Sequence, residues 1–267
     1  MPEARGRVLV IGGSDSGGGA GIQADIKTLT ALGAYAATAI TAITVQNTHG
    51  VRAVHLLAPD LLEAQARAVL DDIGADAIKI GMLGSAAMAE AVARLLDRAA
   101  TIAAVIDPVM VAKGGRGLLE PGAVKVLRAR LISRAALLTP NAPEAAALTG
   151  LIVETTDDLR RAGEALLGLG AGAVLMKGGH IAGDRVIDVL MSSAGETRFE
   201  GPRLATRHTH GTGCTLASAC AAGLAQGLAL DRAVARAWDY TAEAIRRAPG
   251  LGGGHGPLDH AWPMRDR

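Results

Sequence analysis

The chain has 267 residues and a formal net charge of +1; 49% of its residues are apolar and only 2% are aromatic. This length fits one large domain or two small ones, and the apolar content is ample for a core of alanine, valine, leucine and isoleucine. A charge so close to neutral gives no electrostatic reason to expect nucleic acid or an anionic membrane as a partner, and we expect neither.

Two features bear on where the protein works. Residues 1–5 lead directly into a short apolar strand without the pattern of a signal peptide, and the weakly polar stretch 213–230 carries Gln226 and is typical of a buried helix. Cys214 and Cys220 lie six residues apart, so on one helix their side chains would point in different directions. Two thiols without metal-ligand spacing favour a reducing compartment, and we expect a cytoplasmic protein.

The first elements suggest a ligand site. Residues 7–12 are a short apolar run typical of a strand covered on both faces, the glycine-rich segment 13–21 follows, and a helix is expected over 22–32. This layout is that of a phosphate or nucleotide site, although the P-loop and Gly-x-Gly-x-x-Gly patterns are missing. The segment either lets a ligand approach the backbone or is a flexible turn. Asp25 either holds a substrate hydroxyl or amine, or complements the helix dipole.

Two amide side chains follow the next expected strand. Gln46 and Asn47 lie in a polar segment, and each amide offers both a donor and an acceptor, which suits recognition of a heteroaromatic ring. The alternative is a turn in which Asn47 forms an Asx motif. The elements expected around them are a strand at 36–44, an edge strand at 51–57 and an amphipathic helix at 59–73.

Further along, Asp107 directly follows a buried strand. An acidic residue where a parallel strand ends points to the crevice in which open α/β sheets bind ligands. Residues 111–118 contain Lys113 and three glycines, and they indicate either a mobile lid or a long turn. The elements expected in this part are a strand at 77–80, a loop at 81–84, a helix from the cap Ser85 to residue 99, and a strand at 103–106.

Asn141, Glu144 and Lys177 also lie at expected strand ends or helix starts. Asn141 and Glu144 either share a metal ion through waters or cap a helix, with Asn141 as N-cap and Glu144 near N3. Lys177 suits a phosphate contact, or is a solvated lysine at a strand end. The expected elements here are strands at 137–139 and 173–176, a helix at 158–170, and a β pair at 185–191 and 197–199.

The segment 209–215, Thr-His-Gly-Thr-Gly-Cys-Thr, opens an apolar helix expected over 214–227. Glycines before a helix leave its first N–H groups unobstructed, and the helix dipole adds positive charge, so this turn is a site for an anion. A thiol at Cys214 inside such a site is expected to have a lowered pKa and to act as a base or nucleophile. The alternative is a glycine-rich helix start without a ligand. A last helix over 231–247 and a loop at 252–257 complete the chain.

The repeated alternation of strands and helices, without an internal repeat or linker, predicts one α/β domain over residues 1–267. Its sheet is expected to be mostly parallel and to lie between helical layers. The polar candidates fall at the carboxyl ends of expected strands or at helix starts. We therefore expect them to share one crevice.

A set of motifs in one order along nearly the whole chain closely resembles the bacterial hydroxymethylpyrimidine/phosphomethylpyrimidine kinases, which belong to the ribokinase-like superfamily. The resemblance implies a ribokinase-like three-layer α/β/α fold. It also implies phosphorylation of 4-amino-5-hydroxymethyl-2-methylpyrimidine with ATP and Mg²⁺, then of the monophosphate to the diphosphate for thiamine synthesis, by a homodimer. The matching segments are 12–18, 20–25, 46–48, 79–82, 107–110, 139–141 with Glu144, 176–180 and 210–215.

The resemblance also implies roles for single residues. Gln46 would bond the pyrimidine edge, and the turn before the last long apolar helix would hold the γ-phosphate. The implied residues are Gln46, Gly13, Asp25, Met82 and Val109 for the ring; Gly211, Thr212, Gly213 and Cys214 for phosphoryl transfer; Lys177, Asn141 and Thr209 for ATP; and Asp107 and Glu144 for Mg²⁺, directly or through water.

Most sugar kinases of the superfamily carry an aspartate base where Cys214 stands, whereas the pyrimidine kinases carry cysteine. A fixed carboxylate would repel a phosphorylated acceptor by about 4 kcal/mol at about 4 Å and an effective dielectric of about 20. A thiol can stay neutral in the second step and still lose a proton in the first. The other functions considered are a pyridoxal or pyridoxine kinase of the same superfamily, a non-catalytic pyrimidine-binding sensor, and a structural or interaction protein.

Overall fold

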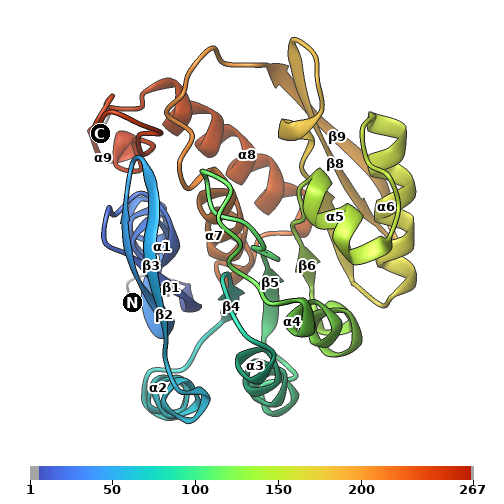
Figure 1. Cartoon of the computed structure of the whole chain (residues 1–267). Helices are drawn as coiled ribbons and strands as arrows, with labels where there is room; N and C mark the ends of the chain where they lie inside the picture. The colour runs from blue at the N-terminus through green and yellow to red at the C-terminus, as the bar shows by residue number, and fades with distance from the viewer. Residues whose placement is uncertain (1–5, 266–267) are drawn as a thin grey trace.

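The computed structural model describes residues 6–265, which form one sheet with helices on both faces (Figure 1). The strands lie in the order β3-β2-β1-β4-β5-β6-β7-β8-β9, parallel from β2 to β7 and antiparallel at the two edges. The expected three-layer, mostly parallel α/β/α fold is confirmed. The strands are β1 (Arg7–Asp15), β2 (Tyr35–Asn47), β3 (Gly50–Leu56), β4 (Ala77–Ile80), β5 (Ala103–Ile106), β6 (Leu137–Leu138), β7 (Ala173–Met176), β8 (Arg185–Ser192) and β9 (Gly195–Pro202).

Two hydrophobic clusters, one on each face of the sheet, explain why the central strands are continuous apolar runs. In β1, Leu9 and Ile11 belong to one cluster, whereas Val8 and Val10 belong to the other. Successive side chains of a strand point to opposite faces, so a strand covered on both sides has no polar face. The first cluster packs under α2 (Pro59–Asp72), α3 (Ala86–Arg98), α5 (Ala142–Thr149) and α6 (Thr156–Gly168), and the second under α1 (Gly21–Ala31), α7 (Thr212–Ala225) and α8 (Leu230–Arg246).

Several element bounds differ from the expected ones for local reasons. Thr155 and Asp158 form a capping box, so α6 begins at Thr156 and not at Asp158. Gly195 has φ 117°, which allows a tight turn, and the β8–β9 pair therefore continues to Ser192 and Gly195. Elements not expected from the sequence are α4 (Pro121–Val126), the irregular turns Leu127–Leu131, Ile132–Arg134 and Gly178–His180, and α9 (Trp262–Arg265).

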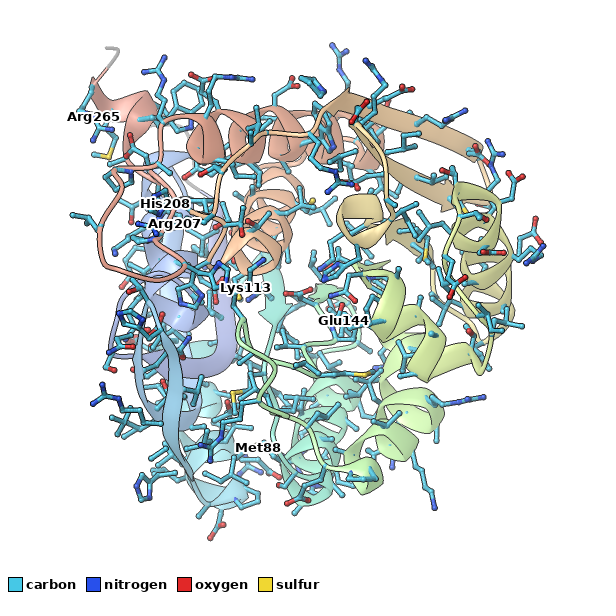
Figure 2. All side chains as sticks on the ribbon, turned by 45° about the horizontal axis from the view of Figure 1, so that its top comes forward. Met88, Lys113, Glu144, Arg207, His208 and Arg265 are labelled. Atoms are coloured by element: carbon cyan, nitrogen blue, oxygen red, sulfur yellow. The ribbon has the colours of Figure 1, made fainter. Side chains whose placement is uncertain are left out.

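The sheet brings the polar candidates to one edge. The carboxyl ends of the parallel strands and the amino-terminal ends of α1, α5 and α7 surround a common depression, and Figure 2 shows Glu144 and Lys113 on this side and Met88 away from it. Among residues 6–265, every helix is too short or too polar to cross a bilayer.

Candidate active site

A pocket of about 480 Å³ lies at this edge of the sheet. Every site residue predicted from the sequence is part of its wall, although the residues come from segments far apart in the chain. The lining includes Gly13, Asp25, Gln46, Met82, Asp107, Val109, Asn141, Glu144, Lys177, Thr209, Gly211, Thr212, Gly213 and Cys214.

The turn that opens α7 is held against the glycine-rich loop after β1. Gly211 has φ 85°, and a Cβ atom there would lie 1.9 Å from the carbonyl oxygen of Gly19, so only glycine fits. No acceptor among the described residues bonds the backbone N–H groups of Gly213 and Cys214, which lie in the first turn of α7. Two unpaired N–H groups at a helix start are what an anion site requires.

Burial raises the pKa of the Cys214 thiol to about 11, because the nearby Lys79 ammonium offsets only part of the desolvation. The expected lowering of this pKa is wrong. Lys79 and the backbone N–H group of Gly21 favour the thiolate, but burial and the carboxylates of Asp25 and Asp107 outweigh them. The thiol is therefore neutral near pH 7, although part of the residue remains open to the pocket.

Below Cys214, Asp25 and Lys79 form a fully buried ion pair. The Lys79 Nζ atom lies 2.9 Å from both carboxylate oxygens, and Ser218 Oγ donates to Asp25 Oδ1 at 2.6 Å. Burial acts to lower the pKa of Lys79, but the attraction and hydrogen bond of Asp25, together with the nearby Cys214 and Asp107, outweigh it and hold that pKa above its usual value. The oxygens of Asp25 thus face Lys79 and Ser218, so we expect Asp25 to position Lys79 and not to bind the substrate directly.

A second charged cluster joins β5, α5 and β7. Lys177 Nζ lies 2.8 Å from Asp107 Oδ1 and 3.9 Å from Glu144 Oε2, and Thr139 Oγ1 donates to the same Asp107 oxygen at 3.2 Å. Burial raises the pKa of Glu144 to about 7, with Lys177 acting against it. Lys177 therefore offers a fixed positive charge beside the anion site.

Asn141 and Glu144 form the capping box that was one of the two interpretations of this pair. Glu144 N donates to Asn141 Oδ1 at 2.9 Å, and Asn141 N donates to Glu144 Oε2 at 2.8 Å. No group of three or more histidine, cysteine or acidic side chains among the described residues is placed to hold a metal ion. Two carboxylates beside a candidate anion site are compatible with Mg²⁺ held mainly by the oxygens of a bound anion and by water.

Another part of the pocket wall contains Gln46, which faces the glycine-rich loop. A Cβ atom at Gly13 would lie 3.0 Å from Met82 Sδ, so the wall here is closely packed. Ser16 Oγ donates to the backbone carbonyl oxygen of Gln46 at 2.8 Å and accepts from the backbone N–H group of Gln46 at 2.9 Å. These two bonds fix the backbone of Gln46.

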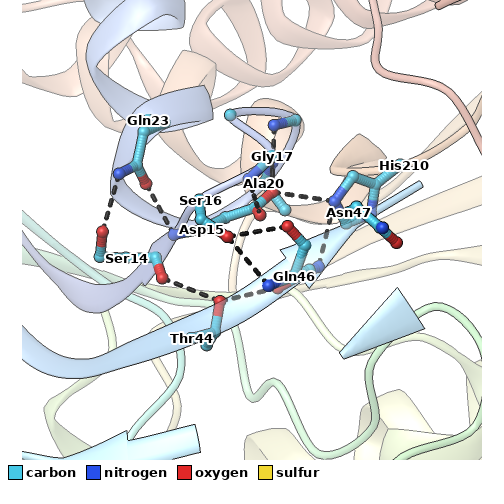
Figure 3. Close-up of polar contacts among 12 residues, drawn as sticks. Ser14, Asp15, Ser16, Gly17, Ala20, Gln23, Thr44, Gln46, Asn47 and His210 are labelled. Atoms are coloured by element: carbon cyan, nitrogen blue, oxygen red, sulfur yellow. Dashed lines mark hydrogen bonds and ion pairs between the residues drawn. The ribbon is translucent and has the colours of Figure 1, made fainter. Parts of the chain in front are cut away.

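The glycine-rich loop is an ordered structure built around Asp15. The carboxylate accepts backbone N–H groups from Gly17, Gly19 and Ala20 at 2.8, 3.0 and 2.9 Å (Figure 3). It also lies 2.9 Å from the Nε2 atom of His210. Sequence reasoning gave no role to Asp15, Lys79 or His210, and the only signal was that each lies within a motif.

Two loops complete the site. The segment 252–257 is a loop, as expected, but it packs on the pocket wall: His255 N donates to the Thr48 carbonyl at 2.7 Å and His210 N to the Gly256 carbonyl at 3.1 Å. The segment 111–118 is tied to β3 by Arg116, which donates to the Arg52 carbonyl at 2.8 Å. Its Lys113 lines the pocket, and burial lowers the pKa of that amine.

Comparison with known proteins identifies the family of the chain and solved structures with the same fold. A family model described as phosphomethylpyrimidine kinase matches residues 15–259. The hydroxymethylpyrimidine/phosphomethylpyrimidine kinase of Streptomyces coelicolor is 51% identical, with 96% of this chain and 95% of that protein covered. The thiamine biosynthesis bifunctional protein ThiED of Geobacter sulfurreducens is 49% identical over all of this chain, which spans 55% of that longer protein. Among solved structures, an ADP complex of Bacillus subtilis pyridoxal kinase superposes with a TM-score of 0.91 at 35% identity, with 99% and 100% of the chains covered.

Proposed function

The chain belongs to the phosphomethylpyrimidine kinase family, and on that premise we propose that it phosphorylates 4-amino-5-hydroxymethyl-2-methylpyrimidine with ATP and then phosphorylates the monophosphate, for thiamine synthesis. The observation that carries the proposal is the shared pocket of Gln46 and the unpaired N–H groups of Gly213 and Cys214. Gln46 can hydrogen-bond a substrate ring while the N–H groups of Gly213 and Cys214 bind a phosphoryl group. We take residues 1–267 as one kinase domain.

Catalysis in this pocket is mainly positioning and charge stabilisation. The N–H groups of Gly213 and Cys214 hold the oxygens of the phosphoryl group, and the Lys177 ammonium offsets their negative charge. In the first step the Cys214 thiolate, a minor species near pH 7, takes the proton of the alcohol as the alcohol oxygen bonds to the γ-phosphorus. The bond between that phosphorus and the bridging oxygen of ATP breaks, and ADP leaves. In the second step the acceptor is already an anion, and the neutral thiol does not repel it.

ATP and Mg²⁺ are the proposed co-substrate and metal. Thr209, Asn141 and Lys177 would lie along the phosphates of ATP, and Asp107 and Glu144 would hold Mg²⁺, directly or through water. The metal supplies neutralisation of phosphate charge when it is bound. Burial raises the pKa of Glu144 to about 7, so its side chain would be mostly a carboxylate only above about pH 7.

We propose a homodimer in the cytoplasm. Ile43 and Val45 are 51% and 49% exposed on the outward face of β2, next to Gln46, and a second copy of the chain would cover them. The unpaired Cys214 and Cys220 suit a reducing compartment. Light scattering of the parent and of Ile43→Asp tests the assembly: a dimer that becomes a monomer supports it, and equal masses contradict it.

Product analysis tests the activity. The purified protein is given ATP, Mg²⁺ and one acceptor, which is the pyrimidine alcohol, its monophosphate or pyridoxal, and the products are resolved by phosphorus NMR. We expect a monophosphate and then a diphosphate from the pyrimidine acceptors. A product from pyridoxal alone would identify a pyridoxal kinase, the activity named for the Bacillus subtilis structure, and binding without any ATP turnover would identify a sensor.

A further inference from the structure

The Nε2 atom of His210 lies between two polar groups on the pocket wall. It is 2.9 Å from Asp15 Oδ2 and 3.1 Å from the side-chain amide of Gln46 (Figure 3). Asp15 and His210 are buried, with 3% and 6% of their surfaces exposed. A ring nitrogen in this position serves as either a donor or an acceptor, and the surrounding groups decide which.

Asp15 requires a donor. Its carboxylate already accepts N–H groups from Gly17, Gly19 and Ala20, so it acts as an acceptor throughout. Burial acts to raise the pKa of Asp15, but the His210 and backbone hydrogen bonds outweigh it and hold that pKa below its usual value. A lone pair of His210 facing this carboxylate would be repelled. The Nε2 atom of His210 must therefore carry a hydrogen.

The same hydrogen decides the orientation of the Gln46 amide. In the structure the amide nitrogen of Gln46 faces the Nε2 atom of His210. Both nitrogens then carry hydrogens, so two hydrogen-bond donors face each other. At the other end of the amide, Thr44 Oγ1 lies 3.2 Å from the amide oxygen and 3.0 Å from the Ser14 carbonyl oxygen. The single hydroxyl hydrogen of Thr44 goes to the nearer Ser14 carbonyl, so the amide oxygen of Gln46 faces a lone pair of the Thr44 oxygen.

A half-turn of the amide removes both conflicts and moves no other atom, since oxygen and nitrogen exchange places. The oxygen of Gln46 then shares the single Nε2–H hydrogen of His210 with Asp15 Oδ2 in a three-centre hydrogen bond, since these acceptors lie 3.1 and 2.9 Å from the nitrogen. The nitrogen donates one hydrogen to Thr44 Oγ1, and the Thr44 hydroxyl donates to the Ser14 carbonyl. The second hydrogen of the amide nitrogen remains available to the pocket.

We propose that His210 is a positioning residue: its Nε2–H group, held by Asp15, fixes the Gln46 amide so that Gln46 presents an N–H donor to the substrate ring. The ring edge that meets Gln46 then carries an acceptor, such as a ring nitrogen. This inference rests on the proposed function. It adds that the edge of the substrate ring in contact with Gln46 carries a hydrogen-bond acceptor. His210 also directly precedes Gly211, so the amide and the anion-binding turn share one support.

Two substitutions at His210 separate positioning from packing. His210→Phe keeps an aromatic side chain without a donor, whereas His210→Gln keeps an N–H donor. We expect His210→Phe to raise the KM of the pyrimidine alcohol by about tenfold, the factor that corresponds to one net hydrogen bond, with the KM of ATP changed less than about twofold. We expect His210→Gln to restore most of the loss. Equal KM values for both variants would overturn the proposal.

A double-mutant cycle with Gln46→Leu tests whether His210 acts through the amide. In the Gln46→Leu background we expect His210→Phe to have no further effect on the KM of the pyrimidine. A further tenfold rise in that background would mean that His210 acts on the substrate by another route, and would overturn the proposal. Thermal melts of all four proteins correct the comparison for any loss of folded protein.

The position of the hydrogen can be read without any assay. Nitrogen-15 NMR of the histidine side chains, with the His210 signals identified by their loss in His210→Gln, distinguishes an Nε2–H ring from one with hydrogen on Nδ1 only. We expect Nε2–H, and hydrogen on Nδ1 only would overturn the proposal. This readout also separates the two claims: an Nε2–H ring in a protein that phosphorylates no pyrimidine would contradict the proposed function and leave the orientation of Gln46 intact.

Discussion

The ammonium of Lys177 and the carboxylate of Asp107 lie 2.8 Å apart directly beside the first turn of α7. A Cβ atom at Gly213 would lie 3.2 Å from Lys177 Nζ and 3.4 Å from Asp107 Oδ2. The space that a side chain would fill at Gly213 is therefore the space beside the charge that we propose stabilises a phosphoryl group. This arrangement explains why the anion site is made of backbone.

Gly213→Val should lower kcat by about 100-fold or more, the effect of losing one donor of an oxyanion site, because the valine side chain enters the phosphoryl position. The KM of the pyrimidine should change much less, since the ring is proposed to bind at Gln46 and not at Gly213. Steady-state kinetics with the pyrimidine alcohol and with its monophosphate measure the changes in kcat and KM separately. Gly168→Val is the matched control, because no atom lies within 4 Å of a Cβ there. A change in the pyrimidine KM alone would contradict the anion-site assignment.

The first phosphorylation should become faster with increasing pH. The pKa of Cys214 is raised to about 11, so the thiolate fraction is small near pH 7 and grows by about tenfold per pH unit up to that value. The alcohol needs this base and the monophosphate does not. We expect the rate ratio of the first to the second step to rise between about pH 7 and pH 9. Cys214→Ser should lose the rise, and a parallel profile for both steps would exclude Cys214 as the base.

Cys214→Asp should slow the second step more than the first. A carboxylate at this position repels an acceptor phosphate by about 4 kcal/mol at about 4 Å and an effective dielectric of about 20. Asp25 and Asp107 already raise the pKa of Cys214, so these two carboxylates also repel any further negative charge placed at this position. Single-turnover rates with each acceptor give the comparison. If the monophosphate reacts as fast as with the parent protein, the electrostatic reason for cysteine is wrong.

The buried pair of Asp25 and Lys79 should be sensitive to loss of either partner. Lys79→Met leaves the Asp25 charge buried and unpaired, and we expect a loss of about 3–5 kcal/mol in the free energy of unfolding. Replacing both residues with apolar ones should recover much of it. Denaturant unfolding measures the change, with the exposed Lys125→Met as control. A loss no larger than about 1 kcal/mol, as for a surface pair, would show that the pair is hydrated.

Local patterns predicted the fold well. The continuous apolar runs of β5 and β7 gave their exact bounds, because a strand buried on both faces has few polar positions. The bounds of β4 were also predicted exactly, although Lys79 interrupts its apolar residues. The capping box of Asn141 and Glu144 involves residues only three apart, so the sequence itself suggested it as one of the two interpretations of this pair. The bounds of β9 and α6 were less accurate because a turn glycine and a capping box extend or shift them.

Long-range burial could not be predicted in the same way. Lys79 lies within an apolar strand, but its partner Asp25 is 54 residues away, so the sequence did not reveal the ion pair. The pKa of Cys214 was predicted in the wrong direction because the helix start is visible in the sequence, whereas the desolvation depends on the packing of α7 against the sheet. The contact between His210 and Asp15 spans 195 residues and was missed for the same reason.

The central claim is that one pocket holds the pyrimidine ring at Gln46 and the transferred phosphoryl group at the start of α7. A crystal structure with the pyrimidine alcohol, Mg²⁺ and a non-hydrolysable ATP analogue tests it most directly. We predict a ring nitrogen within hydrogen-bond distance of the Gln46 amide and γ-phosphate oxygens on the N–H groups of Gly213 and Cys214. A γ-phosphate bound elsewhere, or a ring without contact to Gln46, would contradict the account.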